Sequence, residues 1–312
     1  MKFLVLLNLL FISNAFAYKM TIYTDQPDQT SANEVISTFK KTYPFNQFDM
    51  DFEVKVLSQS ELKCAPINGI ARLLGCDSAN VARDAGRRGV DQALIIKHSS
   101  EYGGSGGAIP VMSSGSPPAT IIHEYLHTLG LCDEYEYSAS EADYYCMSGG
   151  ANMVLIQPDP KGYFSDSDAR SKHMGQIPWG SLIKSTTPIS RPPFLGTAQV
   201  NFSTQSSWNN SSNPNKLNSA IGLYEGKTCR NATINKKVSW LPGGESSIME
   251  KLSAGLGSAN EQIVAKILAS KGVRRKVAGA IPNPSVVDSN SPVDKSDKPT
   301  DKENSSPGTV TR

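Results

Sequence analysis

The stretch of sequence that decides the fold is SPPATIIHEYLHTLGLCDEY, residues 116–135. It holds two of the four histidines of the chain, His123 and His127, with Glu124 directly after the first. Residues four apart lie on one face of a helix, so both imidazoles can bind one metal ion there. Glu124 projects to the side, where it is well placed to take a proton from a water molecule that the metal activates. The spacing therefore predicts a catalytic zinc site.

The residues around the two histidines favour a helix at this position. Ser116, followed by Pro117 and Pro118, predicts a helix start that Ser116 caps. Apolar residues then recur at helical spacing, and Gly130 predicts the end because glycine can adopt the left-handed conformation that reverses the chain.

A third ligand is expected just beyond this reversal. A catalytic zinc ion has three protein ligands and leaves its fourth position to water. Asp133 follows Gly130 by three residues, and an Asp oxygen binds zinc at a distance similar to that of a His nitrogen. We therefore expect the two histidines and Asp133 to bind one catalytic Zn²⁺. Glu134, which a slip of one residue in the turn would present, and Glu141 further along are weaker alternatives.

The segment His123–Tyr135, HEYLHTLGLCDEY, resembles the IgA-metallopeptidase-type family of metzincins, which share H-E-x-x-H-x-x-G-x-x-D followed by Glu-Tyr. It is more loosely similar to the snapalysins. Three shorter segments resemble the first family too: the glycine-rich Tyr102–Gly107, the Pro-Trp segment Ile177–Ile183, and the Tyr-Glu element Ile221–Gly226. The resemblance covers residues 90–255 or so.

The resemblance implies a zinc metalloendopeptidase in which Glu124 is the general base. In metzincins an extended substrate adds to an antiparallel edge strand. Glycines and Pro110 suit such a strand here, and Gly106, Gly107, Ala108 and Ile109 are the expected substrate-binding residues. The polar stretch from 229 to 237 departs from the family pattern and leaves substrate preference open.

Metzincins also place a methionine beneath the zinc ion. The resemblance favours Met249, which follows the Tyr-Glu element, whereas spacing alone would favour Met147. An ordinary core methionine is the alternative for either residue.

The remaining pattern predicts an α/β (α+β) fold, and the resemblance implies that it is metzincin-like: a mixed twisted sheet with an antiparallel edge strand, the active-site helix, and an irregular C-terminal subdomain. Strands are expected at Met20–Thr24, Phe52–Val56 and Val90–Lys97. Ser31 and Ser258 begin capping-box patterns, which predict two further helices. We expect a signal peptide at 1–17, subdomains at 18–131 and 132–272, and a disordered tail at 273–312.

Several observations bear on location and partners. A basic start, a short apolar run and Ala15-Phe16-Ala17 predict a signal peptide that is cleaved after Ala17, and hence a secreted or periplasmic protein. Cys64 and Cys76 are expected to pair, and Cys132 to pair with Cys146 or Cys229, with the odd cysteine free.

The expected partner is a protein or peptide substrate, and the expected state is a monomer. A net charge of +2 gives no argument for nucleic acid, and no internal apolar run is long enough for a membrane span. Two alternatives stay open: a non-catalytic module that binds a peptide or a surface, and a zinc hydrolase of cell-wall peptides.

Overall fold

The computed structural model of the chain describes residues 17–67, 69–156, 169–184, 221–234 and 237–276. Residues 1–16 of the expected signal peptide and 277–312 of the expected tail lie outside the described residues. Residues 273–276, which we had assigned to the tail, belong to the folded part, because the backbone of Asp49 donates to Arg274 O and Phe48 bridges to Arg275. Within the described ranges, no helix has the length and apolar character that crossing a membrane requires.

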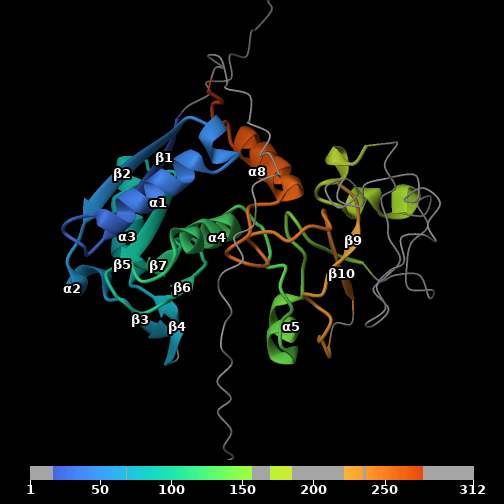
Figure 1. The fold of residues 1–312 in the computed structure, drawn as a ribbon, viewed down its shortest axis with the longest axis horizontal. Coiled ribbons are helices and arrows are strands. Elements are labelled where there is room, and N and C mark those ends of the chain that lie inside the picture. Colours follow the sequence, from blue (N-terminus) through green and yellow to red (C-terminus); the bar gives the residue numbers. More distant parts are fainter. Residues whose placement is uncertain (1–16, 68, 157–168, 185–220, 235–236, 277–312) are drawn as a thin grey trace, which may run out of the picture. The chain divides into compact units, whose positions relative to one another are not determined.

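A mixed sheet of seven strands organises the fold, in the order β2-β1-β5-β7-β6-β4-β3 (Figure 1). Strands β2, β1, β5 and β7 are mutually parallel, β6 is antiparallel to β7, and β3 is antiparallel to β4. The predicted α/β class with a mixed sheet is therefore confirmed. The strands are β1 (Tyr18–Thr24), β2 (Met50–Val56), β3 (Ala65–Ile67), β4 (Ile70–Gly75), β5 (Gln92–Lys97), β6 (Gly104–Ser105) and β7 (Val111–Ser113).

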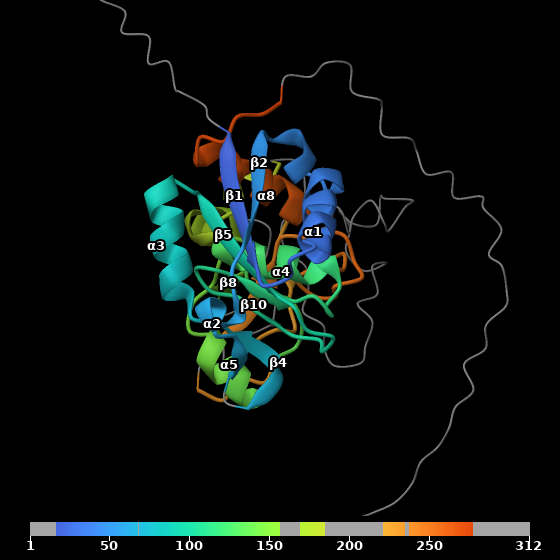
Figure 2. The ribbon, with the colours of Figure 1, turned by 90° about the vertical axis from the view of Figure 1, so that its left-hand side faces the viewer.

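Helices cover both faces of this sheet (Figure 2). Side chains alternate between the two faces of a strand, so Met20 and Ile22 of β1 join one core cluster and Tyr23 joins another. The first cluster packs against α1, α4 and α8, and the second against α3. The α-helices are α1 (Thr30–Lys41), α2 (Gln59–Leu62), α3 (Ser78–Arg88), α4 (Pro118–Thr128), α5 (Ala139–Tyr145) and α8 (Ser258–Ser270).

Three of the predicted helix starts are wrong by one or two residues. Helix α1 begins at Thr30, so Ser31 lies inside it, where it is buried. Ser116 does not cap α4, because its hydroxyl bonds the backbone of Gly103 instead. Ser258 is the first residue of α8, and the Glu245 carboxylate accepts from its backbone N–H and its hydroxyl. In α4 and α8, the serine that the local pattern predicted as the cap forms hydrogen bonds with a residue distant in sequence instead.

The glycine-rich segment is not the edge strand that we expected. Its ordered part, β6, lies between β7 and β4, and the sheet ends at β2 on one side and at β3 on the other. An antiparallel edge strand exists, but it is β3. Residues 107–109 form bends beyond β6, and Gly107 has a φ of 121°, which breaks the strand. The hairpin of β3 and β4 supplies the extra strands that the sequence did not reveal.

A second, smaller sheet lies after α5 in the chain, with the order β8-β10-β9. The indole N–H of Trp240 donates to Ile156 O, and that of Trp179 to Gly222 O at 2.8 Å. Trp179 and Gly222 come from the Pro-Trp and Tyr-Glu segments, so these two segments are in contact. The strands are β8 (Val154–Ile156), β9 (Tyr224–Glu225) and β10 (Val238–Leu241), and short helical turns occur at η1 (Phe45–Gln47), η2 (Ala169–His173), η3 (Met174–Gln176) and η4 (Gly180–Leu182).

Candidate metal centre

Helix α4 presents both histidines on the face opposite its buried side. Ile121, Ile122, Tyr125 and Leu126 are fully buried against the sheet and α1. The histidines are only partly buried, and their rings meet edge to face with centroids 4.9 Å apart. The spacing of apolar and polar residues along α4 therefore fixes where the imidazoles point.

Asp133 faces the two histidines, as the sequence predicted. Gly130 takes a left-handed φ of 85° at the helix end, and its N–H donates to His127 O. The reversed chain then brings Asp133 Oδ1 within 3.1 Å of His123 Nε2 and 3.4 Å of His127 Nε2. Three atoms with lone pairs thus converge from two adjacent turns of helix and one loop.

The other ring nitrogen of each histidine is engaged by a backbone carbonyl. His123 Nδ1 lies 3.0 Å from Ile248 O, and His127 Nδ1 lies 2.9 Å from Leu131 O. A carbonyl only accepts, so Nδ1 carries the proton in both rings. This tautomer leaves the Nε2 lone pairs free for a metal ion, which is the usual arrangement of a histidine ligand.

The electrostatics of this group also suit a cation. Burial lowers the pKa of His127, but the nearby Asp133 carboxylate outweighs this effect and raises that pKa to about 9. The pKa of His123 is raised by the same balance. Burial pushes the pKa of Asp133 upward, whereas the two histidines hold it well below its usual range. Without a metal ion, a proton therefore binds where a cation would bind.

The donor set fits a zinc ion. Asp133 Oδ1 is buried and has no hydrogen bond of acceptable geometry, although both Nε2 atoms are close. The other carboxylate oxygen, Oδ2, accepts from the hydroxyl of Tyr137 at 2.7 Å, which orients the carboxylate. A buried oxygen that lacks a donor is costly unless a cation binds it. Two imidazoles and one carboxylate are a ligand set that zinc accepts.

Glu124 lies close enough to the two histidines to form a possible metal-binding group with them. One of its oxygens lies within 4.8 Å of ligand atoms on both histidines. Burial raises its pKa, the effect of the two histidines being smaller. A carboxylate whose pKa is raised is a stronger proton acceptor than an ordinary glutamate.

Glycines of the β6 segment contact the Glu124 carboxylate. A Cβ at Gly104 would lie 3.3 Å from Glu124 Oε1, and one at Gly106 would lie 3.2 Å from Oε2 and 3.1 Å from His127 Cδ2. Gly106, Gly107 and Ala108 are exposed, and Ile109 is half-buried. The segment that we expected to bind substrate therefore borders the histidines and Glu124, although it does so in bends and not as an edge strand.

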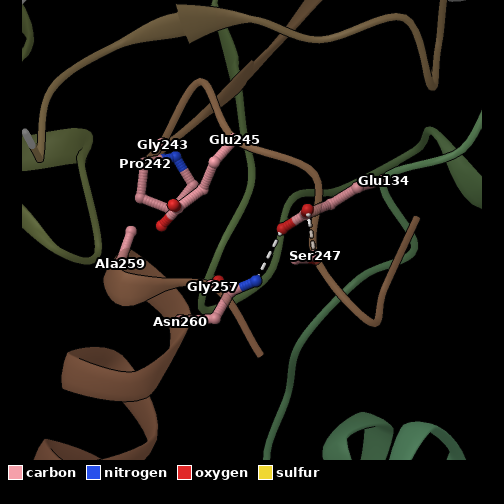
Figure 3. Close-up of a pocket in the computed structure, with 8 residues that line it drawn as sticks. All are labelled: Glu134, Pro242, Gly243, Glu245, Ser247, Gly257, Ala259 and Asn260. Carbon is pink, nitrogen blue, oxygen red and sulfur yellow. Dashed lines mark hydrogen bonds between the residues drawn. The ribbon is translucent and has the colours of Figure 1, made fainter. Parts of the chain in front are cut away.

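Neither rival ligand faces the histidines. Glu134 points into a buried polar network (Figure 3). It accepts from the amides of Asn152 and Asn260 at 2.8 and 2.9 Å and from the Ser247 hydroxyl at 2.6 Å. Glu141 accepts from Ser138 in the capping box of α5. The slip that would present Glu134 does not occur, because this network binds its carboxylate on the side away from the metal centre.

The two candidate methionines differ sharply in burial. Met249 is fully buried in the core cluster that α4 joins, and its carbonyl accepts from the Glu134 N–H. Its neighbour Ile248 supplies the carbonyl that fixes the His123 tautomer. Met147 has 70% of its surface exposed. Met249 is therefore a buried core residue next to a residue that contacts His123, whereas Met147 lies at the surface.

The cysteine pairing was predicted in part. Cys64 and Cys76 are disulfide-bonded, as expected. Cys146 pairs with Cys229, so the expected pairing of Cys132 with either of them is wrong. Cys132 is the free cysteine. Burial, followed by the charges of Asp133 and Glu134, raises the pKa of its thiol to about 11, which disfavours the thiolate that a metal would bind.

The sequence did not predict four residues that donate hydrogen bonds to Asp133 and Glu134. Tyr137 orients Asp133, and Asn152, Ser247 and Asn260 bind Glu134. The Asp-Glu-Tyr-Glu-Tyr run was a signal that could have pointed to Tyr137, since a hydroxyl four residues from a ligand can reach its carboxylate. The other three are distant in sequence and carry no local signal.

No model of a known protein family matches the chain, and a search of curated protein sequences finds no match.

Proposed function

We propose that this chain is a zinc-dependent endopeptidase that hydrolyses peptide bonds with Glu124 as the general base. The observation that carries the proposal is the convergence of His123 Nε2, His127 Nε2 and Asp133 Oδ1, with Glu124 beside them. These three residues would hold the ion. A zinc ion bound there supplies a Lewis acid that makes a water molecule and a peptide carbonyl more reactive.

The residues of the chain perform the proton transfers. Glu124 accepts the proton of the attacking water at a carboxylate oxygen and delivers it to the nitrogen of the leaving amine. Its raised pKa makes the carboxylate a stronger base for the first half of this transfer. The close approach of Gly104 and Gly106 restricts where the carboxylate can move. The exposed residues 106–108 lie beside it, where a peptide can bind.

Two further observations support the proposal. The resemblance of residues 123–135 to metzincins agrees with the observed position of Asp133. Two disulfides favour an oxidising compartment, in line with the expected export of the chain.

Digestion of casein and of a peptide library, with and without a zinc chelator, tests the proposal. We expect cleavage that the chelator abolishes and that added zinc restores. Glu124→Ala should abolish turnover while the protein retains its zinc. A non-catalytic binding module would bind zinc without cleaving any peptide, and a hydrolase of cell-wall peptides would cleave only those. Full peptidase activity in the Glu124→Ala protein would refute the role of Glu124.

A further inference from the structure

A series of tyrosines leads from Asp133 to the protein surface. The hydroxyl of Tyr137 donates to Asp133 Oδ2, and the Tyr137 ring contacts Tyr135 and Tyr145, each with centroids 5.3 Å apart. Tyr145 in turn contacts Tyr144 at 4.8 Å. We call Tyr135, Tyr137, Tyr144 and Tyr145 the tyrosine surface. It joins the metal centre to α5 without a break.

Three members of this surface are unusually exposed. Tyr144 has 73% of its surface accessible, Tyr145 has 56% and Tyr135 has 39%, whereas Tyr137 is buried beneath them. Exposed aromatic residues that touch one another, next to a candidate catalytic site, typically mark a binding surface.

The backbone below the tyrosine surface is firmly held. The Cys146–Cys229 disulfide joins the end of α5 to the loop 229–234. Asp143 of α5 accepts from the backbone N–H groups of Thr233 and Ile234, and Asn231 donates to Tyr137 O at 2.8 Å. A rigid aromatic surface loses little conformational entropy when a ligand binds to it.

The charges around these rings select the kind of ligand. The run from Asp133 to Tyr145, DEYEYSASEADYY, contains five carboxylates, four tyrosines and no basic residue. Of the two basic residues in the segment 221–234, Lys227 pairs with Glu250 at 2.7 Å, and Arg230 lines a pocket together with Glu225 and Lys237. Apart from Asp133 in the metal centre and the buried Glu134, the carboxylates of this run are those of Glu136, Glu141 and Asp143, and the run contributes no positive charge.

We propose that the tyrosine surface binds a lysine or arginine side chain of the peptide substrate, close to the bond that is cleaved. A cation over an aromatic ring is attracted by the ring quadrupole, and the aliphatic stem of the same side chain packs on the remaining ring surface. The nearby carboxylates of Glu136 and Glu141 attract the same charge. The inference rests on the proposed function, for which it supplies a substrate class.

Binding of labelled peptides to the inactive Glu124→Ala protein tests this proposal without relying on turnover. The probes are a ten-residue peptide with one central arginine and the same peptide with citrulline or glutamate in its place. We expect the arginine peptide to bind about tenfold more tightly than the citrulline peptide, and added salt to reduce the difference. Equal affinity for all three peptides, or tighter binding of the glutamate peptide, would overturn the proposal.

Two variants locate the binding surface. Tyr144→Leu and Tyr145→Leu keep an apolar side chain but remove the ring, and each should weaken binding of the arginine peptide about threefold. Tyr43→Leu, at an exposed tyrosine near the end of α1, is the matched control and should leave binding unchanged. If Tyr144→Leu and Tyr145→Leu both bind the arginine peptide as tightly as the control, the tyrosine surface is not the binding site.

Cleavage by the wild-type protein separates the two hypotheses. A peptide library that is cleaved without preference for a basic residue within a few positions of the cut bond would remove this inference and leave the endopeptidase intact. Preferred binding of the arginine peptide by a protein that cleaves no peptide would support the binding surface and contradict the endopeptidase.

Discussion

Removal of the Glu134 carboxylate should be among the most damaging single changes in the molecule. Glu134 is 6% exposed and accepts three side-chain hydrogen bonds, from Asn152, Asn260 and Ser247. Its backbone N–H also donates to Met249 O. It thus joins the chain after Asp133 to the turn at Met249 and to α8, and the position of the candidate metal ligand depends on it.

The magnitude follows from the groups that would lose their acceptor. Glu134→Ala leaves three buried donors without a partner, and each costs about 1–3 kcal/mol, so we expect a loss of about 3–9 kcal/mol in the free energy of unfolding. Glu134→Gln keeps the oxygen that accepts from both asparagines and changes only the contact with Ser247. We expect this variant to lose about 1 kcal/mol.

Chemical denaturation of the two variants and of an exposed control measures the difference. Glu34→Ala, on the outer face of α1, should change the free energy of unfolding by less than about 0.5 kcal/mol. The result that would refute the reasoning is a Glu134→Ala protein as stable as Glu134→Gln. The midpoint should shift without a change in the slope of the transition, because the surface exposed on unfolding stays the same.

Three other changes should have separate effects. Tyr137→Phe removes the hydroxyl that orients Asp133 and should weaken zinc binding about tenfold in a titration with a competing chelator; an unchanged Kd would contradict that role. Gly106→Ala should lower kcat/KM at least about tenfold, because the added Cβ would crowd Glu124 and His127. Gly86→Ala is the control: its Cβ would meet open space in α3, so this variant should raise the free energy of unfolding by about 0.5–1 kcal/mol. At a pH below the raised pKa of His127, about 9, zinc must displace a proton from this residue. The Kd for zinc should therefore fall about tenfold per pH unit as the pH rises toward that value. A Kd that does not change with pH would contradict this linkage.

The elements that carry local signals could be predicted from the sequence. The buried run of β5, the alternation of β1 and β2, and the helix that holds the histidines all form where periodicity indicated. The convergence of Asp133 on both imidazoles was predictable because it depends on one helix end and a glycine. Local stereochemistry decides such features.

The features that depend on distant contacts could not be predicted. The position of β6 inside the sheet depends on the β3–β4 hairpin, which carries only a weak strand pattern. Ser116 bonds Gly103 and Glu245 binds Ser258, so tertiary partners decide both helix starts. The pairing of Cys146 with Cys229 spans 83 residues, and no spacing rule selects it over the alternatives.

Metal analysis of the purified protein tests the central claim most directly. After dialysis against zinc and then against metal-free buffer, we predict one zinc ion per chain in the wild-type protein. Asp133→Ala removes one of three ligands and should lose that zinc while the fold persists, as circular dichroism would show. A wild-type protein that retains no zinc, or an Asp133→Ala protein that retains it with undiminished affinity, would contradict the account.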